Sequence, residues 1–173
     1  MKKILVFKSD RLGDLINISS VIHNLKKNFP SSEITIVCSK YNSRIAKYYL
    51  DLQNIIIFDK SFFKFSLKYF KKLYLTKYDL LLQLDGKKSS YFCSSIVNSN
   101  IKAGLVFVKN KKILNNLSIV KRPNFLISKF FSYLEPCIED YQISNNKDYH
   151  YLNLYLNILK KINLTIYSKS HYL

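Results

Sequence analysis

Short apolar runs recur along the chain and are separated by longer segments of mixed character. They cover residues 3–8, 33–38, 54–58, 78–84 and 101–106, and β-branched side chains are common in them. The first run is apolar at consecutive positions, which is typical of a strand covered on both faces of a parallel sheet. The pattern therefore predicts five buried strands.

Helical periodicity occupies the segments between these runs. Apolar side chains recur every three or four positions from Leu15 to Phe29, and Pro30 ends the pattern. Further helices are predicted over residues 39–50, 61–76 and 88–98. Strands that alternate with helices form βαβ units, so we expect an α/β fold whose doubly wound, mostly parallel sheet is Rossmann-like.

The pattern weakens after residue 106. A basic stretch covers residues 109–112, a proline-containing segment follows at 121–136, and helical spacing returns at 151–163. A chain of 173 residues, 48% of them hydrophobic, fits one domain of ordinary size. We expect residues 1–150 to form this domain and residues 151–173 to form a helix and tail.

The sequence is strongly basic, with 28 Lys and Arg against 11 Asp and Glu and a net charge of +17. Such a charge attracts nucleic acid, anionic lipid or an acidic substrate. The lysines are dispersed along the whole chain, so the charge reflects a general bias in composition as much as a binding face. A non-catalytic nucleic-acid-binding module is a rival interpretation, although no recognition motif supports it.

The cysteines and the apolar runs bear on the compartment. No run approaches the roughly 18 residues that a membrane-spanning helix needs. Cys38, Cys93 and Cys137 form no CxxC pair, and an odd, scattered number is typical of a reducing compartment. We therefore expect a cytoplasmic protein. The three histidines are far apart in sequence, so no metal site is predicted.

All three glycines, Gly13, Gly86 and Gly104, stand at or near the predicted carboxyl ends of strands. Open α/β sheets bind ligands at this edge, because the loops that leave the strands line the crevice there. Glycine allows positive φ and close backbone approach, which favours a ligand-binding edge. For Gly86 and Gly104, tight turns between strand and helix explain the residues equally well.

The first of these turns carries the sequence Arg11-Leu12-Gly13-Asp14 between a strand and a helix. Backbone N–H groups at a helix N-terminus suit an anion or a polar sugar group. The turn has neither the three glycines of a dinucleotide-binding loop nor the Gly-Lys-Ser/Thr of a phosphate-binding loop. Asp14 fits two roles, as a helix cap or as a general base that faces the crevice.

These residues resemble the N-terminal half of the lipopolysaccharide heptosyltransferases, family 9 of the glycosyltransferases. As in that family, a strand at residues 3–8 precedes an Arg-Leu-Gly-Asp turn, and Tyr78-Asp79 leads through an apolar run to Asp85-Gly86. A strand with a basic residue and then a glycine follows at residues 102–104. The matches run in order over residues 1–106, and the later part of the chain resembles the family weakly.

The resemblance implies a GT-B enzyme that transfers heptose from ADP-heptose to a lipid-linked inner-core acceptor, with inversion, at the inner face of the cytoplasmic membrane. It implies that Asp14 is the catalytic base, which takes the proton from the acceptor hydroxyl. It also implies that Arg11, Gly13, Asp85 and Gly86 bind substrate. No cofactor or metal is implied beyond the nucleotide-sugar donor.

The same resemblance implies that the donor-binding domain is missing, because it would need roughly another 150 residues. Either a second polypeptide supplies that domain, or the chain is a truncated, inactive or partner-binding half-protein. We therefore expect no transferase activity from the isolated 173-residue chain.

A basic stripe follows the third predicted helix, where Lys60, Lys64, Lys68 and Lys72 recur every four residues. A basic face with aromatic anchors is typical of a helix that lies on a membrane surface. The alternative, which we favour for most of these residues, is a solvated helix whose aromatic side chains pack on the sheet. Our hypothesis is that Lys60 and Lys64 face the anionic acceptor or the lipid headgroups that hold it.

Overall fold

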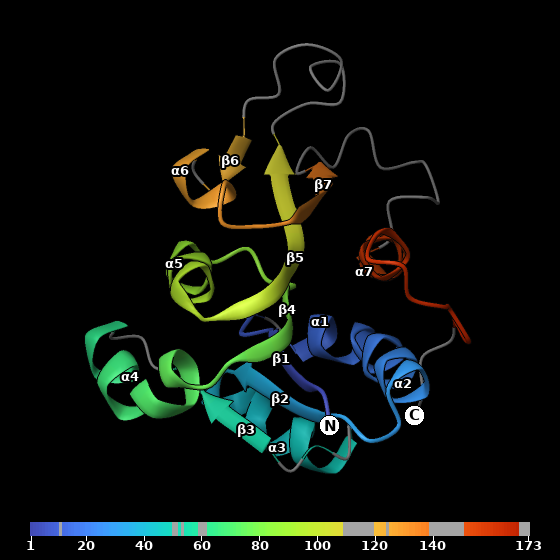
Figure 1. Ribbon diagram of the computed structural model, residues 1–173, viewed down its shortest axis with the longest axis horizontal. Coiled ribbons are helices and arrows are strands. Elements are labelled where there is room, and N and C mark those ends of the chain that lie inside the picture. Colours follow the sequence, from blue (N-terminus) through green and yellow to red (C-terminus); the bar gives the residue numbers. More distant parts are fainter. Residues whose placement is uncertain are drawn as a thin grey trace.

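The computed structural model describes residues 1–10, 12–49, 52, 54–58, 62–108, 120–123, 125–138 and 151–169. A central sheet runs through the molecule, and helices cover both of its faces (Figure 1). Within these ranges, no helix combines the length and the apolar character that crossing a bilayer requires.

The predicted doubly wound parallel sheet is confirmed. Its parallel strands are β1 (Lys3–Phe7), β2 (Glu33–Cys38), β3 (Asn54–Ile57), β4 (Tyr78–Gln83) and β5 (Ser99–Val108). They lie in the order β3-β2-β1-β4-β5, so the chain builds outwards from β1 in one direction and then returns to add β4 and β5 on the other side. The carboxyl ends of β1 and β4 therefore flank the topological switch point, where such sheets bind ligands.

Two more strands extend the sheet in the region where the sequence pattern is weak. β7 (Tyr133–Ile138) pairs with β5 in parallel, and β6 (Val120–Arg122) pairs with β5 in antiparallel fashion. Pro136 lies within β7, where it is tolerated because an edge strand needs hydrogen-bond partners on one side only. The proline obscures the strand in the sequence, as does the short helix α6 (Phe125–Ser128) between the two strands.

Seven helical segments complete the described fold apart from α6. They are α1 (Leu12–Asn17), α2 (Ser19–Asn28), α3 (Lys40–Tyr49), α4 (Phe62–Lys68), the π-helix η1 (Lys71–Leu75), α5 (Lys88–Ile96) and α7 (Tyr151–Lys161). The sequence predicted one helix over 15–29, and this is wrong, because the chain breaks at Ile18 into α1 and α2. The helix predicted over 61–76 is also divided, into α4 and η1.

Alternate side chains of β1 supply two separate cores. Ile4 and Val6 belong to the first core cluster, which includes residues of α1, α2, α3 and α7. Leu5 and Phe7 belong to the second core cluster, which includes Phe65 of α4. All four β1 side chains are fully buried. In Figure 1, α1, α2 and α7 accordingly lie on one side of the sheet and α4, α5 and α6 on the other. Burial on both faces explains the consecutive apolar positions of the first strand.

The segment after α7 lies along α2. The side-chain oxygen of Asn24 accepts a hydrogen bond from the backbone N–H of Tyr167 at 2.7 Å, and that of Asn28 accepts one from Thr165 at 3.1 Å. Residues of α7 are part of the first core cluster. Residues 151–169 therefore pack on the fold formed by the earlier strands, and the boundary predicted at residue 150 falls outside the described residues.

Candidate active site

The loops after β1 and β4 meet at the switch point and are tied together by a buried carboxylate. Asp85, at the end of β4, has no exposed surface. Its oxygens accept hydrogen bonds from the backbone N–H and hydroxyl of Ser9 at 2.9 and 2.8 Å, the hydroxyl of Ser90 at 3.0 Å, the amide of Gln83 at 3.0 Å and the backbone N–H of Lys87 at 3.0 Å. Asp85 therefore holds both loops in place. Its binding to substrate stays a prediction.

The same pair of loops is reinforced by lysine ammonium groups. Lys87, just before α5, donates from its side chain to the backbone oxygen of Ser9. Lys8 is only 1% exposed, and its ammonium donates to Asp10 at 2.9 Å, to the backbone oxygen of Leu84 at 3.0 Å and to the Tyr155 hydroxyl at 2.7 Å. All three protons of the Lys8 ammonium thus have acceptors, which offsets the cost of burying its charge.

Sequence reasoning did not identify Lys8, Asp10 or Tyr155 as site residues. Tyr155 lies on α7, where the sequence pattern predicts only helical spacing. Burial, with a smaller contribution from nearby Asp10 and Asp14, raises the pKa of the Tyr155 hydroxyl well above its ordinary value. The hydroxyl is therefore neutral and accepts a hydrogen bond from the Lys8 ammonium. A lysine that ends an otherwise apolar strand was the available sequence signal.

Asp10 is a carboxyl group of this site with a raised pKa. Burial raises its pKa from 3.8 to about 6, the Lys8 ammonium opposes the shift, and Asp85 and Asp14 add to it. Asp10 Oδ2 contacts Lys8, whereas Oδ1 is buried and has no hydrogen-bond partner among the described residues. The side-chain amide of Asn42, on α3, holds the Asp10 backbone oxygen at 2.9 Å. Asp10 is thus held in place, with one carboxylate oxygen that is both unpaired and closed off from solvent.

Asp14 lies in the first turn of α1 and is partly exposed. The helix begins two residues earlier, at Leu12, and within the described chain the Asp14 carboxylate forms no hydrogen bond or ion pair. Gly13 beside it is exposed, and a methyl group built on it would meet no atom within 4 Å. The structure thus presents an unengaged carboxylate next to open space. Its role as a general base stays a prediction.

The structure brings only some of the predicted site residues together. Gly13 and Asp14 follow β1, and Asp85 and Gly86 follow the adjacent strand β4. Lys64 is exposed in the first turn of α4, which follows β3, two strands away from β1. Arg11 and Lys60 lie outside the described residues.

Gly104 corrects the prediction that all three glycines mark the ligand edge. It lies inside β5, paired with Gln83 of β4. A methyl group there would come within 2.5 Å of the Gln83 backbone oxygen, so glycine is required by close contact between the strands. None of the three glycines has a positive φ angle. Gly13 is therefore not needed for an unusual backbone angle, and the open space above it is its distinctive feature.

The described residues offer little support for a metal site or for a cysteine nucleophile. They contain no group of three or more His, Cys, Asp or Glu arranged to hold a metal ion. Burial raises the pKa of both Cys38 and Cys93 to about 12, so neither thiol is a ready nucleophile. A hollow lined by Lys3, Glu33, Thr35, Asn54, Lys72, Thr76 and Tyr78 lies at the amino ends of the strands, away from the switch point.

Solved structures share this architecture over nearly the whole chain. A family 9 glycosyltransferase from Veillonella parvula aligns with 98% of it at a TM-score of 0.70 and 20% identity. The heptosyltransferase WaaC of E. coli, solved with ADP, aligns with 95% at a TM-score of 0.67 and 13% identity. The chain has the fold of half a GT-B glycosyltransferase.

That likeness is one of fold, because the identities are low. The chain spans 44% of the Veillonella protein and 48% of WaaC, or about half of their length. A second WaaC structure, with ADP-2-deoxy-2-fluoro heptose, aligns at a TM-score of 0.63 with 50% of its length. The sequence itself matches no protein-family model and no curated protein.

Proposed function

We propose that the chain is the acceptor-binding half of a glycosyltransferase that transfers a heptose from a nucleotide sugar to an inner-core, lipid-linked acceptor. The observation that carries the proposal is the unengaged carboxylate of Asp14, held at the switch point of a sheet that family 9 glycosyltransferases share. The acceptor would be reached from the cytoplasmic side of the membrane.

In this proposal Asp14 removes the proton from the acceptor hydroxyl. A lone pair of the deprotonated acceptor oxygen then attacks the anomeric carbon of the donor sugar. The bond between that carbon and the nucleoside diphosphate breaks, and the configuration at the carbon inverts. Arg11, Gly13 and Gly86 line the acceptor or its phosphate groups.

The donor, ADP-heptose in this proposal, would be bound by a second Rossmann-like domain. Support comes from WaaC, which was solved with ADP and with a fluorinated ADP-heptose and is about twice as long as this chain. No metal or further cofactor is part of the reaction.

Equilibrium binding to the purified chain tests the proposal. We expect a phosphorylated inner-core oligosaccharide to bind and ADP-heptose to bind at least about tenfold more weakly, because only the acceptor half is present. Asp14→Asn should retain acceptor binding within about threefold, since a base is needed for the transition state rather than for ground-state binding. Asp79→Asn, at the opposite end of β4, is the matched control.

Two results would contradict this function. Failure of the oligosaccharide to bind would favour the alternative, a catalytically inactive chain that binds a partner. Release of ADP from ADP-heptose by the isolated chain in the presence of acceptor would show that it needs no second domain.

A further inference from the structure

Exposed apolar side chains are concentrated on one side of the molecule. Seven of the eleven large hydrophobic side chains that are exposed in the described chain are Leu67, Phe70, Leu75, Phe92, Ile96, Leu126 and Phe130. They belong to α4, η1, α5, α6 and the residues adjoining these helices, which lie along the same side of the sheet (Figure 1). We call these seven residues and the helices that carry them the α4–α6 face.

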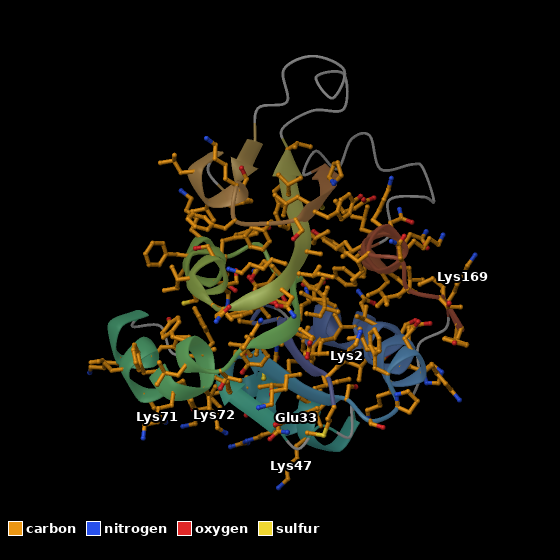
Figure 2. The ribbon with its side chains drawn as sticks, in the orientation of Figure 1. Lys2, Glu33, Lys47, Lys71, Lys72 and Lys169 are labelled. Carbon is orange, nitrogen blue, oxygen red and sulfur yellow. The ribbon has the colours of Figure 1, made fainter. Side chains whose placement is uncertain are left out.

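The α4–α6 face is also basic and carries no acidic residue. Its exposed lysines are Lys64, Lys68, Lys71, Lys72, Lys88 and Lys129. Residues 62–77, 87–97 and 125–132 contain no Asp or Glu. Figure 2 shows Lys71 and Lys72 projecting from the end of this layer. Exposed apolar side chains among exposed lysines are therefore the chemistry that this surface offers.

Charge alone does not distinguish this side from the other. Lys26 and Lys27 are exposed at the end of α2, and Lys160 and Lys161 are exposed at the end of α7. In the helices α1, α2, α3 and α7, however, Tyr41 is the single large hydrophobic side chain that is exposed among those whose burial the structure describes. Among the described side chains, lysines and exposed apolar groups thus occur together most densely on the α4–α6 face.

We propose that the α4–α6 face docks on the surface of an anionic lipid bilayer. Apolar side chains at an interface insert into the boundary between headgroups and acyl chains, while lysines bind anionic headgroups. A second copy of the chain fits this surface poorly, because it would bring lysines against lysines. Leu67 and Leu75 are each 66% exposed, and a bilayer would remove this apolar area from water.

The position of the α4–α6 face also gives bilayer docking a use, and this step rests on the proposed function. Helices α4 and α5 begin where β3 and β4 end, at the carboxyl edge of the sheet that carries Asp14. Lys87, at the start of α5, contacts the backbone of Ser9 in the loop before Asp14. The loop that leads to the candidate base is therefore tied to the docked layer. Asp14 itself lies on α1, on the other side of the sheet, so a lipid-linked acceptor would reach it around the carboxyl edge.

Sedimentation of the full chain with vesicles tests the proposal without any sugar. We expect binding to vesicles of equal parts phosphatidylglycerol and phosphatidylcholine, and at least about tenfold weaker binding to pure phosphatidylcholine. Lys71→Glu with Lys72→Glu should weaken binding about tenfold or more, as should Leu67→Ser with Phe70→Ser. The charge-matched control, Lys26→Glu with Lys27→Glu on α2, should change binding less than about twofold. Retained thermal unfolding transitions check that each variant folds.

A fluorescence measurement locates the docked face directly. The sequence contains no tryptophan, so Phe70→Trp and Tyr41→Trp each create a unique reporter on opposite layers. On adding anionic vesicles, we expect a blue shift from the Phe70→Trp protein and none from the Tyr41→Trp protein. Equal shifts, equal losses in the two lysine pairs, or dimerisation that the Leu67→Ser, Phe70→Ser protein loses would each overturn the proposal. Vesicle binding without oligosaccharide binding would uphold it and reject the proposed function.

Discussion

At the scale of single residues, the site is governed by how buried charges are compensated. Lys8 is inside the fold with three acceptors, and Asp85 is inside it with five donors. Asp10 is only partly compensated, because one of its oxygens has no partner among the described residues. Its raised pKa follows from that imbalance, since burial outweighs the attraction of Lys8.

Asp10 should therefore make stability depend on pH. A carboxyl whose pKa is about 6 in the folded chain and 3.8 otherwise binds more protons when folded. Its contribution to the free energy of unfolding is fully present below pH 3.8 and is lost as pH rises through about 6. The difference in unfolding free energy between the wild type and Asp10→Asn should fall by up to about 3 kcal/mol over that interval.

Urea denaturation of both proteins from pH 4 to pH 7 measures this difference, because effects of other titrating groups cancel in the comparison. Carbon-13 labelling of the aspartate carboxyl groups gives an independent reading. A titration midpoint for Asp10 near 4 would show that Lys8 dominates its environment and would remove the predicted dependence.

At the scale of the elements, close contact between β4 and β5 depends on Gly104. In Gly104→Ala the new methyl group would lie 2.5 Å from the Gln83 backbone oxygen and 2.8 Å from its Cβ. Backbone atoms of two paired strands cannot move apart without loss of their hydrogen bonds. We expect a loss of about 2–4 kcal/mol in unfolding free energy, measured by chemical denaturation.

Gly13→Ala is the matched control for this substitution. Gly13 lies in α1, has no positive φ angle, and has open space where the methyl group would go. Alanine should therefore raise stability by about 0.5–1 kcal/mol through helix propensity. Equal destabilisation by the two substitutions would contradict the assignment of Gly104 to strand contact. If ligand occupies the open space, Gly13→Ala should still weaken acceptor binding.

At the scale of the whole molecule, the lysines behind the net charge of +17 are spread over the surface and do not gather at one site. Figure 2 places Lys71 and Lys72 on one flank, Lys47 below them and Lys169 on the opposite flank. A dispersed charge of this kind attracts polyanions without orienting them.

Binding to a single-stranded oligonucleotide should accordingly be weak and sensitive to salt. We expect gel-shift affinity at low ionic strength to fall by at least about a hundredfold at physiological salt, because only phosphate contacts contribute. The Lys71, Lys72 and the Lys26, Lys27 reversals should weaken it equally, in contrast to their unequal effects on vesicles. A specific complex that persists at physiological salt would revive the nucleic-acid-binding interpretation.

The sequence alone determined the parallel α/β class and the place of Asp14. Strands buried on both faces and amphipathic helices leave periodicities that are local, so each element can be read from its own residues. A turn between the first strand and the first helix of such a sheet necessarily lies at its carboxyl edge, so the sequence alone locates Gly13 and Asp14 there. The break at Ile18 and the strands β6 and β7 escaped this reasoning, because tertiary packing rather than periodicity sets them.

Only the tertiary structure decided what surrounds that turn. Ser9 and Asp85 are 76 positions apart, and Lys8 and Tyr155 are 147 apart. Ser9 and Asp85 meet because the order β3-β2-β1-β4-β5 sets β1 beside β4. Lys8 and Tyr155 meet because α7 packs in the first core cluster. A local pattern records whether a side chain is apolar, but the partner of a buried charge depends on which distant segments the fold brings together.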